Sequence, residues 1–121
     1  MRNHYFVVEP ELIVAQDLAH AIKVFDPKAK VHHFRSTPEA WTALLRLKPK
    51  AILLQADPVS FAKTPMAEAL TEREVPYALT GPDAQTATES GAVLALPFSE
   101  ASVAALLRRL LNSGDSDGGP G

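Results

Sequence analysis

Four polar side chains stand at or just beyond the ends of apolar runs, and their types limit the chemistry open to them. They are Glu9, Gln55, Asp57 and Thr80. The two carboxylates could hold a divalent cation weakly, although a pair of separate solvated acids is the more ordinary interpretation. The chain has no cysteine, and we find no nucleophile with a plausible base, no metal cluster and no paired carboxylates at a useful site. We therefore expect a protein that is not an enzyme and that has neither a metal nor another cofactor.

The run Ala51-Ile52-Leu53-Leu54-Gln55 predicts the strand around which these groups gather. Four consecutive apolar residues without alternation are typical of a strand buried on both faces, as at the centre of a parallel sheet. Asp57-Pro58 ends the run. Because ligands of open α/β sheets bind beyond the carboxyl ends of the strands, Gln55 and Asp57 are expected at the functional edge.

Strands and helices alternate along the rest of the chain. Strands are expected over residues 4–8, 30–35, 51–55, 75–80 and 92–96, and helices over 12–25, 36–48, 84–89 and 99–111, with another that starts near Pro65 within 58–73. Ser36 and Glu39 are spaced as a capping box. The second strand is the more polar and is expected at an edge. This alternation predicts a flavodoxin-like (βα)5 three-layer sandwich with a parallel five-stranded sheet in the order 2-1-3-4-5.

Length and composition predict one domain over residues 1–111 and a disordered tail over 112–121, which has no core-forming residue and would also suit a linker in a longer protein. The net charge of -2 offers no broad attraction to nucleic acid or to an anionic membrane. No apolar run is long enough to span a bilayer or to act as a secretory signal. A cytoplasmic protein is expected.

Three motifs, in order, resemble the receiver domain of bacterial response regulators. Residues 6–11 are similar to the first receiver strand, which normally ends in two acids; residues 75–81 are similar to the fourth, which ends in threonine or serine; and residues 91–98 are similar to the fifth, which carries a lysine before a proline. The resemblance covers roughly His4 to Leu111. It implies a place in two-component signal transduction, where a central aspartate receives a phosphoryl group from a histidine kinase and the acid pair holds Mg²⁺.

The resemblance, carried over residue by residue, implies a degenerate phosphorylation site. Glu9 matches the first acid, Pro10 the second, Gln55 the phosphoacceptor, Thr80 the hydroxyl and Leu96 the lysine. Proline offers no ligand, an amide cannot form an acyl phosphate, and leucine has no charge. Phosphoryl transfer needs a metal and fixed cations to neutralise developing charge. The resemblance thus implies a phosphorylation-independent pseudo-receiver that acts through protein–protein interaction or self-association.

Two alternatives remain open at this edge. If the central strand ran two residues further, Asp57 could be the acceptor, although the following Pro58 favours a turn or helix-cap aspartate. A small-ligand sensor that uses the crevice around Glu9, Gln55 and Thr80 is the alternative function, without a Gly-rich loop to indicate a nucleotide.

The last helix carries a wide apolar stripe that is the expected face for a protein partner or a homodimer. Its members are Val103, Leu106, Leu107 and Leu110, with Arg108 and Arg109 beside them. Receivers commonly dock or dimerise through their last helices, so the resemblance implies the same surface. The alternative is that every apolar member faces the core and the arginines form a solvated face.

Overall fold

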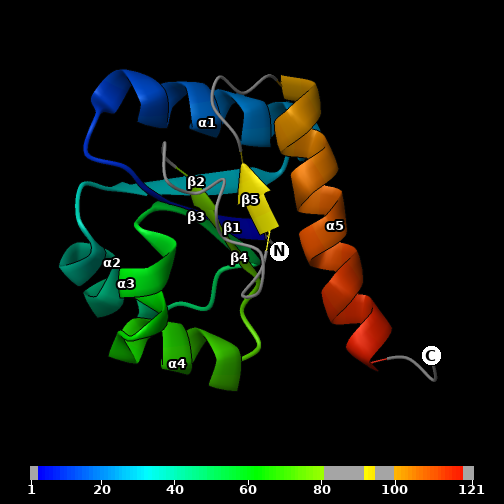
Figure 1. Ribbon diagram of the computed structural model, residues 1–121. Coiled ribbons are helices and arrows are strands. Elements are labelled where there is room, and N and C mark those ends of the chain that lie inside the picture. The colour runs from blue at the N-terminus through cyan, green and yellow to red at the C-terminus, as the bar shows by residue number, and fades with distance from the viewer. Residues whose placement is uncertain (1–2, 81–91, 95–99, 119–121) are drawn as a thin grey trace.

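The computed structural model describes residues 3–80, 92–94 and 100–118 and contains one parallel sheet of five strands (Figure 1). The strands are β1 (Asn3–Val8), β2 (Ala29–Phe34), β3 (Ala51–Gln55), β4 (Tyr77–Thr80) and β5 (Ala92–Leu94). Their order is β2-β1-β3-β4-β5. The predicted order and the edge position of the polar second strand are confirmed.

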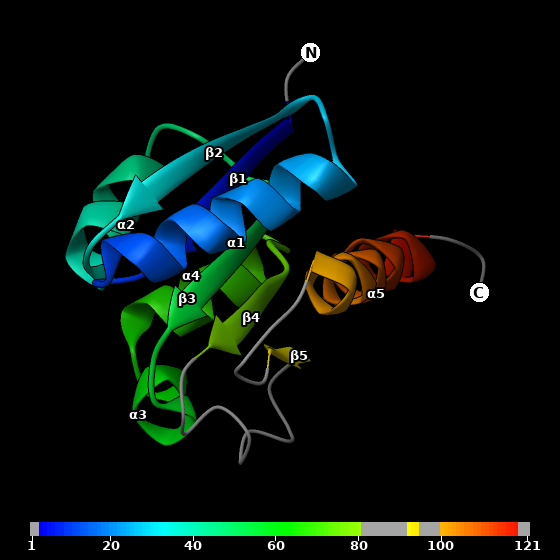
Figure 2. The same ribbon diagram turned by 90° about the horizontal axis from the view of Figure 1, so that it is seen from above.

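The described helices cover both faces of this sheet. They are α1 (Leu12–Phe25), α2 (Thr37–Leu44), α3 (Pro58–Ala62), α4 (Pro65–Glu72) and α5 (Glu100–Gly118). Helices α1 and α5 pack on one face, and α2, α3 and α4 pack on the other (Figure 2). The fold is the predicted flavodoxin-like three-layer sandwich.

Strand β3 is buried on both faces, as its uninterrupted apolar run predicts. Ala51 and Leu53 pack in the cluster under α1 and α5, while Ile52 and Leu54 pack in the cluster under the other three helices. Successive side chains of a strand point to opposite faces, so both faces need apolar residues when both are covered by helices.

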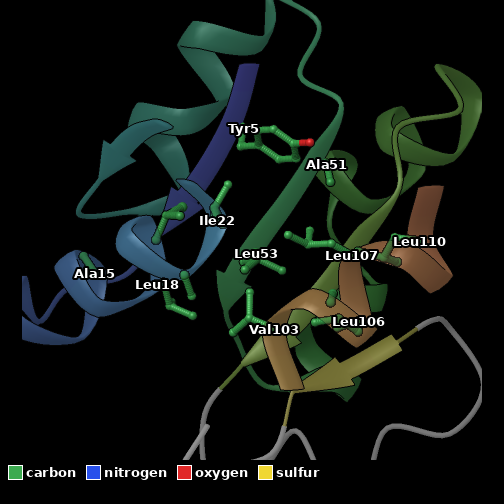
Figure 3. Packing of buried hydrophobic residues seen from close by; sticks show 13 residues of the cluster. Tyr5, Ala15, Leu18, Ile22, Ala51, Leu53, Val103, Leu106, Leu107 and Leu110 are labelled. Atoms are coloured by element: carbon green, nitrogen blue, oxygen red, sulfur yellow. The ribbon is translucent and has the colours of Figure 1, made fainter. Parts of the chain in front are cut away.

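The apolar stripe of α5 faces this core. Side chains from α1 and α5 converge over β3 around Leu53 (Figure 3). The four predicted interface residues Val103, Leu106, Leu107 and Leu110 are all buried. For these four residues the observed arrangement is the alternative in which the apolar members face the core, because they pack with α1 and the strands in one cluster.

The starts of the helices differ from the expected capping. Ser36 is the N-cap of α2, but its hydroxyl donates to the Glu39 carboxylate at 3.0 Å instead of accepting a backbone N–H, so the predicted capping box is wrong. The segment after β3 forms two short helices, and each has a proline in its first turn. Asp57 caps α3, and Thr64 caps α4 by accepting from the Ala67 N–H at 3.2 Å.

Helix α5 extends to Gly118, beyond the point where the composition predicts a tail. The helix thus includes residues 112–118, and the disorder expected for the tail stays a prediction. The domain boundary at residue 111 stays a prediction. The helix expected over 84–89 lies outside the described residues. No helix in the described ranges has the length and apolar character that a bilayer crossing requires.

Candidate functional site at the carboxyl edge of the sheet

The carboxyl ends of three adjacent strands bring the predicted site residues to one edge. Gln55 ends β3 and pairs in register with Thr80, which ends β4. Glu9 directly follows β1, the neighbour of β3 on its other side. The sequence-based prediction that these three groups share an edge is confirmed by the strand order. Leu96, which matches the family's lysine, lies outside the described residues.

The Glu9 carboxylate is bound by the backbone of its own loop. Its side chain is buried, and Oε2 accepts the Glu11 N–H at 3.0 Å. The Glu9 backbone is also held, because its N–H donates to the Phe34 carbonyl at 2.9 Å. Pro10 is exposed and offers no second carboxylate. Within the described ranges no three residues of the His, Cys, Asp and Glu types are grouped so that they could hold a metal ion.

Gln55 and Thr80 are neighbours in the sheet but have opposite exposures. The Gln55 side chain is exposed, whereas Thr80 is buried with an exposed fraction of 2%. The Thr80 hydroxyl has no hydrogen-bond partner among the described residues and does not bond to Gln55. A buried hydroxyl without a partner costs about 1–3 kcal/mol, which makes Thr80 a candidate contact for a bound molecule.

Asp57 acts as a helix cap. It lies two residues beyond the end of β3, and its Oδ2 accepts the Ser60 N–H at 2.9 Å at the start of α3. Hydrogen bonds from the Ser60 backbone and side chain hold the pKa of Asp57 below its ordinary value. The prediction of a cap aspartate is confirmed, and β3 does not extend to Asp57.

Helix α5 contributes exposed charge, in contrast to its buried apolar stripe. Arg108 and Arg109 are both exposed. The Arg108 guanidinium lies 5.9 Å from the centre of the Phe25 ring on α1, which is a cation–π distance, so this arginine also joins the two helices.

Three large apolar side chains near the carboxyl edge are exposed, which the sequence reasoning missed. Leu12 and Ile13 begin α1 directly after β1 and are 59% and 74% exposed, and Val59 in α3, directly after β3, is 64% exposed. Leu12 and Ile13 fall within the apolar spacing of residues 12–25, which by itself would place them on the buried side of this helix. Their exposure could have been inferred from their position before the regular series of buried residues Ala15, Leu18 and Ile22.

Comparison with solved structures identifies the class of fold. The chain is similar to a response regulator from Thermotoga maritima, with a TM-score of 0.74 and 15% identity over 93% of this chain and 99% of that chain. It is similar to SdrG from Sphingomonas melonis Fr1, with a TM-score of 0.70 and 26% identity over 92% and 97% of the two chains. A receiver domain of a histidine kinase from Syntrophus aciditrophicus gives a TM-score of 0.68 and 20% identity over 92% and 91%.

The chain therefore has the fold of a response-regulator receiver domain, and the resemblance seen in its motifs is confirmed at this level. Neither family models nor curated proteins gave a match.

Proposed function

We propose that this chain is a phosphorylation-independent pseudo-receiver that acts in bacterial signal transduction by binding a protein partner or a second copy of itself. The observation that carries the proposal is Gln55, the residue that ends β3 at the functional edge. The lone pair of an amide nitrogen is delocalised and its oxygen is a poor nucleophile. Gln55 therefore cannot accept a phosphoryl group as a carboxylate does.

The groups around Gln55 support the same conclusion. Mg²⁺ in phosphoryl-transfer sites is usually held by one or two carboxylates together with water and phosphate. The Glu9 carboxylate is bound to the backbone of its own loop, and Asp57 caps α3. Position 96 carries leucine where a lysine would be needed, so the charge that develops on a transferring phosphoryl group lacks that neutralising cation.

The test is exposure to acetyl phosphate, and separately to BeF3⁻, each with Mg²⁺. SdrG is the natural positive control, since its solution structure has been described in a BeF3-activated conformation. We expect no phosphorylated species by mass spectrometry and no change in the amide spectrum of this chain, while SdrG responds. An acid-labile phosphoryl group that appears on this chain and is lost in Asp57→Asn would overturn the proposal.

Exposed apolar side chains support protein binding at the same edge. Leu12, Ile13 and Val59 offer apolar area where a functional receiver would carry out its chemistry. The matched comparison is Ile13→Ser against Val24→Ser, since Val24 is an exposed apolar residue (54%) at the other end of α1. If this edge mediates self-association, Ile13→Ser lowers the mass measured by light scattering and Val24→Ser does not.

The last helices remain a proposed second contact, now limited to exposed residues such as Arg109. Arg109→Glu should weaken an association through this face. A chain that stays monomeric at micromolar concentration and whose partner binding is insensitive to both Ile13→Ser and Arg109→Glu would contradict both surfaces.

A small-ligand sensor is the second candidate, and the unpartnered Thr80 hydroxyl favours it. A ligand that accepts this hydroxyl's hydrogen bond beside Gln55 would relieve its desolvation cost. Thermal-shift screening of small acids and nucleotides tests this candidate, and a true ligand of this site should lose its effect in Thr80→Val.

A further inference from the structure

Two histidines from neighbouring strands meet on one face of the sheet, and neither belongs to the site described above. His4 lies on β1 and His32 on β2, and the register pairs Phe6 with His32 and Lys30 with His4. The histidines are thus diagonal neighbours on one face of the sheet, close enough for long side chains to touch. His4 Nδ1 lies 3.0 Å from His32 Nε2, and the ring centroids are 5.2 Å apart.

The surroundings hold this pair in place and favour the neutral form of His32. The buried Phe6 ring contacts His32 edge-on with centroids 5.5 Å apart, so it backs the pair on its inner side. Burial lowers the pKa of His32, and the charges of His4 and Lys30 lower it further. Because β2 is an edge strand and both histidines are only half-buried, solvent still reaches the pair.

We propose that His4 and His32 form a two-histidine site for a borderline transition-metal ion, with Zn²⁺ as the reference case. Neutral imidazole nitrogen suits Zn²⁺, Cu²⁺ and Ni²⁺, whereas Mg²⁺ prefers oxygen. With Zn–N bonds of about 2.0–2.1 Å and tetrahedral angles, two ligand nitrogens lie roughly 3.3–3.4 Å apart. The observed N···N distance of 3.0 Å is a few tenths of an ångström shorter than this, so metal binding requires the rings to separate slightly and to tilt until both lone pairs point at one ion.

Metal binding replaces the hydrogen bond between the two rings, and this step needs only a change of tautomer in one imidazole. Without a metal, one of the two facing nitrogens carries a proton and donates a hydrogen bond to the other. On metal binding that proton moves, through solvent, to the other nitrogen of the same ring, so both facing nitrogens offer a lone pair to the metal. Because no third protein ligand is grouped with them in the described ranges, water or a donor from another molecule fills the remaining positions.

The chain supplies its own controls in its two other histidines. His33 is exposed, points to the opposite face of β2 and places Nε2 2.8 Å from the Glu9 carbonyl oxygen. His20 lies on α1 and contacts the Glu100 carboxylate at 3.0 Å. An unspecific histidine effect would involve these residues equally.

The test is calorimetric titration of the untagged chain with Zn²⁺ near neutral pH, with Mg²⁺ as a negative control. We expect one Zn²⁺ per chain, with affinity lowered in His4→Gln and in His32→Gln by more than the ~10–100-fold that loss of an outer-shell partner costs. His33→Gln and His20→Gln should bind as the unaltered chain does. Absent binding, or an equal loss in the two control variants, overturns the proposal.

A second measurement does not depend on whether the variants fold. In the unaltered chain, Zn²⁺ should shift the imidazole nitrogen resonances of His4 and His32 and leave those of His20 and His33 in place. Shifts confined to His20 or His33 would place the ion elsewhere and overturn the assignment.

Discussion

Asp26 connects β1 to the turn between α1 and β2, and its removal tests whether that connection is cooperative. Its carboxylate accepts hydrogen bonds from the Asn3 side chain at 2.7 Å, from the Tyr5 hydroxyl at 3.0 Å and from the Lys28 N–H at 3.1 Å. It therefore joins β1 to the turn between α1 and β2. The Tyr5 side chain is 1% exposed, so its hydroxyl has little access to water as a replacement partner.

We expect Asp26→Ala to lower the free energy of unfolding by about 2–4 kcal/mol. Most of this comes from Tyr5, because a buried donor left without a partner costs about 1–3 kcal/mol, while Asn3 and the Lys28 N–H can turn to water for less than about 1 kcal/mol each. In the background of Tyr5→Phe no hydroxyl remains to be left unpaired. There, Asp26→Ala should cost only about 1–2 kcal/mol.

Urea unfolding followed by circular dichroism measures the four free energies of this double-mutant cycle. The expected coupling between Asp26 and Tyr5 is about 1–2 kcal/mol. Purely additive costs would refute the reasoning, since they would mean that the Tyr5 hydroxyl finds another partner.

The pH dependence of the same group supplies an independent check. Burial acts to raise the pKa of Asp26, but hydrogen bonds from Asn3, Tyr5 and Lys28 and the charge of Lys50 bring it below 3.8. A carboxylate with a depressed pKa in the folded state stabilises the protein above the unfolded pKa, and this contribution is lost as the pH falls through the folded pKa. Asp26→Ala should therefore flatten the acid limb of stability below about pH 4.

Three further changes follow from single contacts. Thr80→Val should leave the free energy of unfolding unchanged or raise it by up to ~1 kcal/mol, because it replaces a buried hydroxyl that has no described partner; a clear loss in urea unfolding would mean that the hydroxyl has one. His32→Phe should flatten the dependence of the urea midpoint on pH between about 7.5 and about 5.5. Because the pKa of His32 in the folded state lies below the ordinary 6.5, protonation favours the unfolded chain, and the stability seen above about pH 6.5 is lost as the pH falls. Asp57→Ala should speed hydrogen exchange at the Ser60 amide, while Asp57→Asn, which keeps an N-cap, should not, and equal rates in the two variants would contradict the cap.

Several elements followed directly from local patterns. The apolar run 51–55 predicted a strand with the observed bounds, and the polar second strand lies at the expected edge. Asp57 before Pro58 predicted a cap, which the Ser60 N–H completes. These predictions succeed because they depend on side-chain periodicity and on contacts within four residues.

Other features depended on competition between contacts. Ser36 and Glu39 have capping-box spacing, yet their side chains bond to each other. The width of the α5 stripe could not reveal whether Leu106 and Leu110 are exposed, because that depends on how much of the sheet face α1 leaves uncovered. The exposure of Ile13 is decided in the same way, by what packs against the first turn of α1.

The sequence by itself determined the alternation of strands and helices, the strand buried at the centre, and the amide at the end of that strand, because each is written in residue type and short spacing. Only the tertiary structure decided that His4 meets His32 and that Tyr5 meets Asp26, pairs separated by 28 and 21 residues. Such contacts arise from strand register and helix docking, which are set by the packing of the whole core and not by any local pattern.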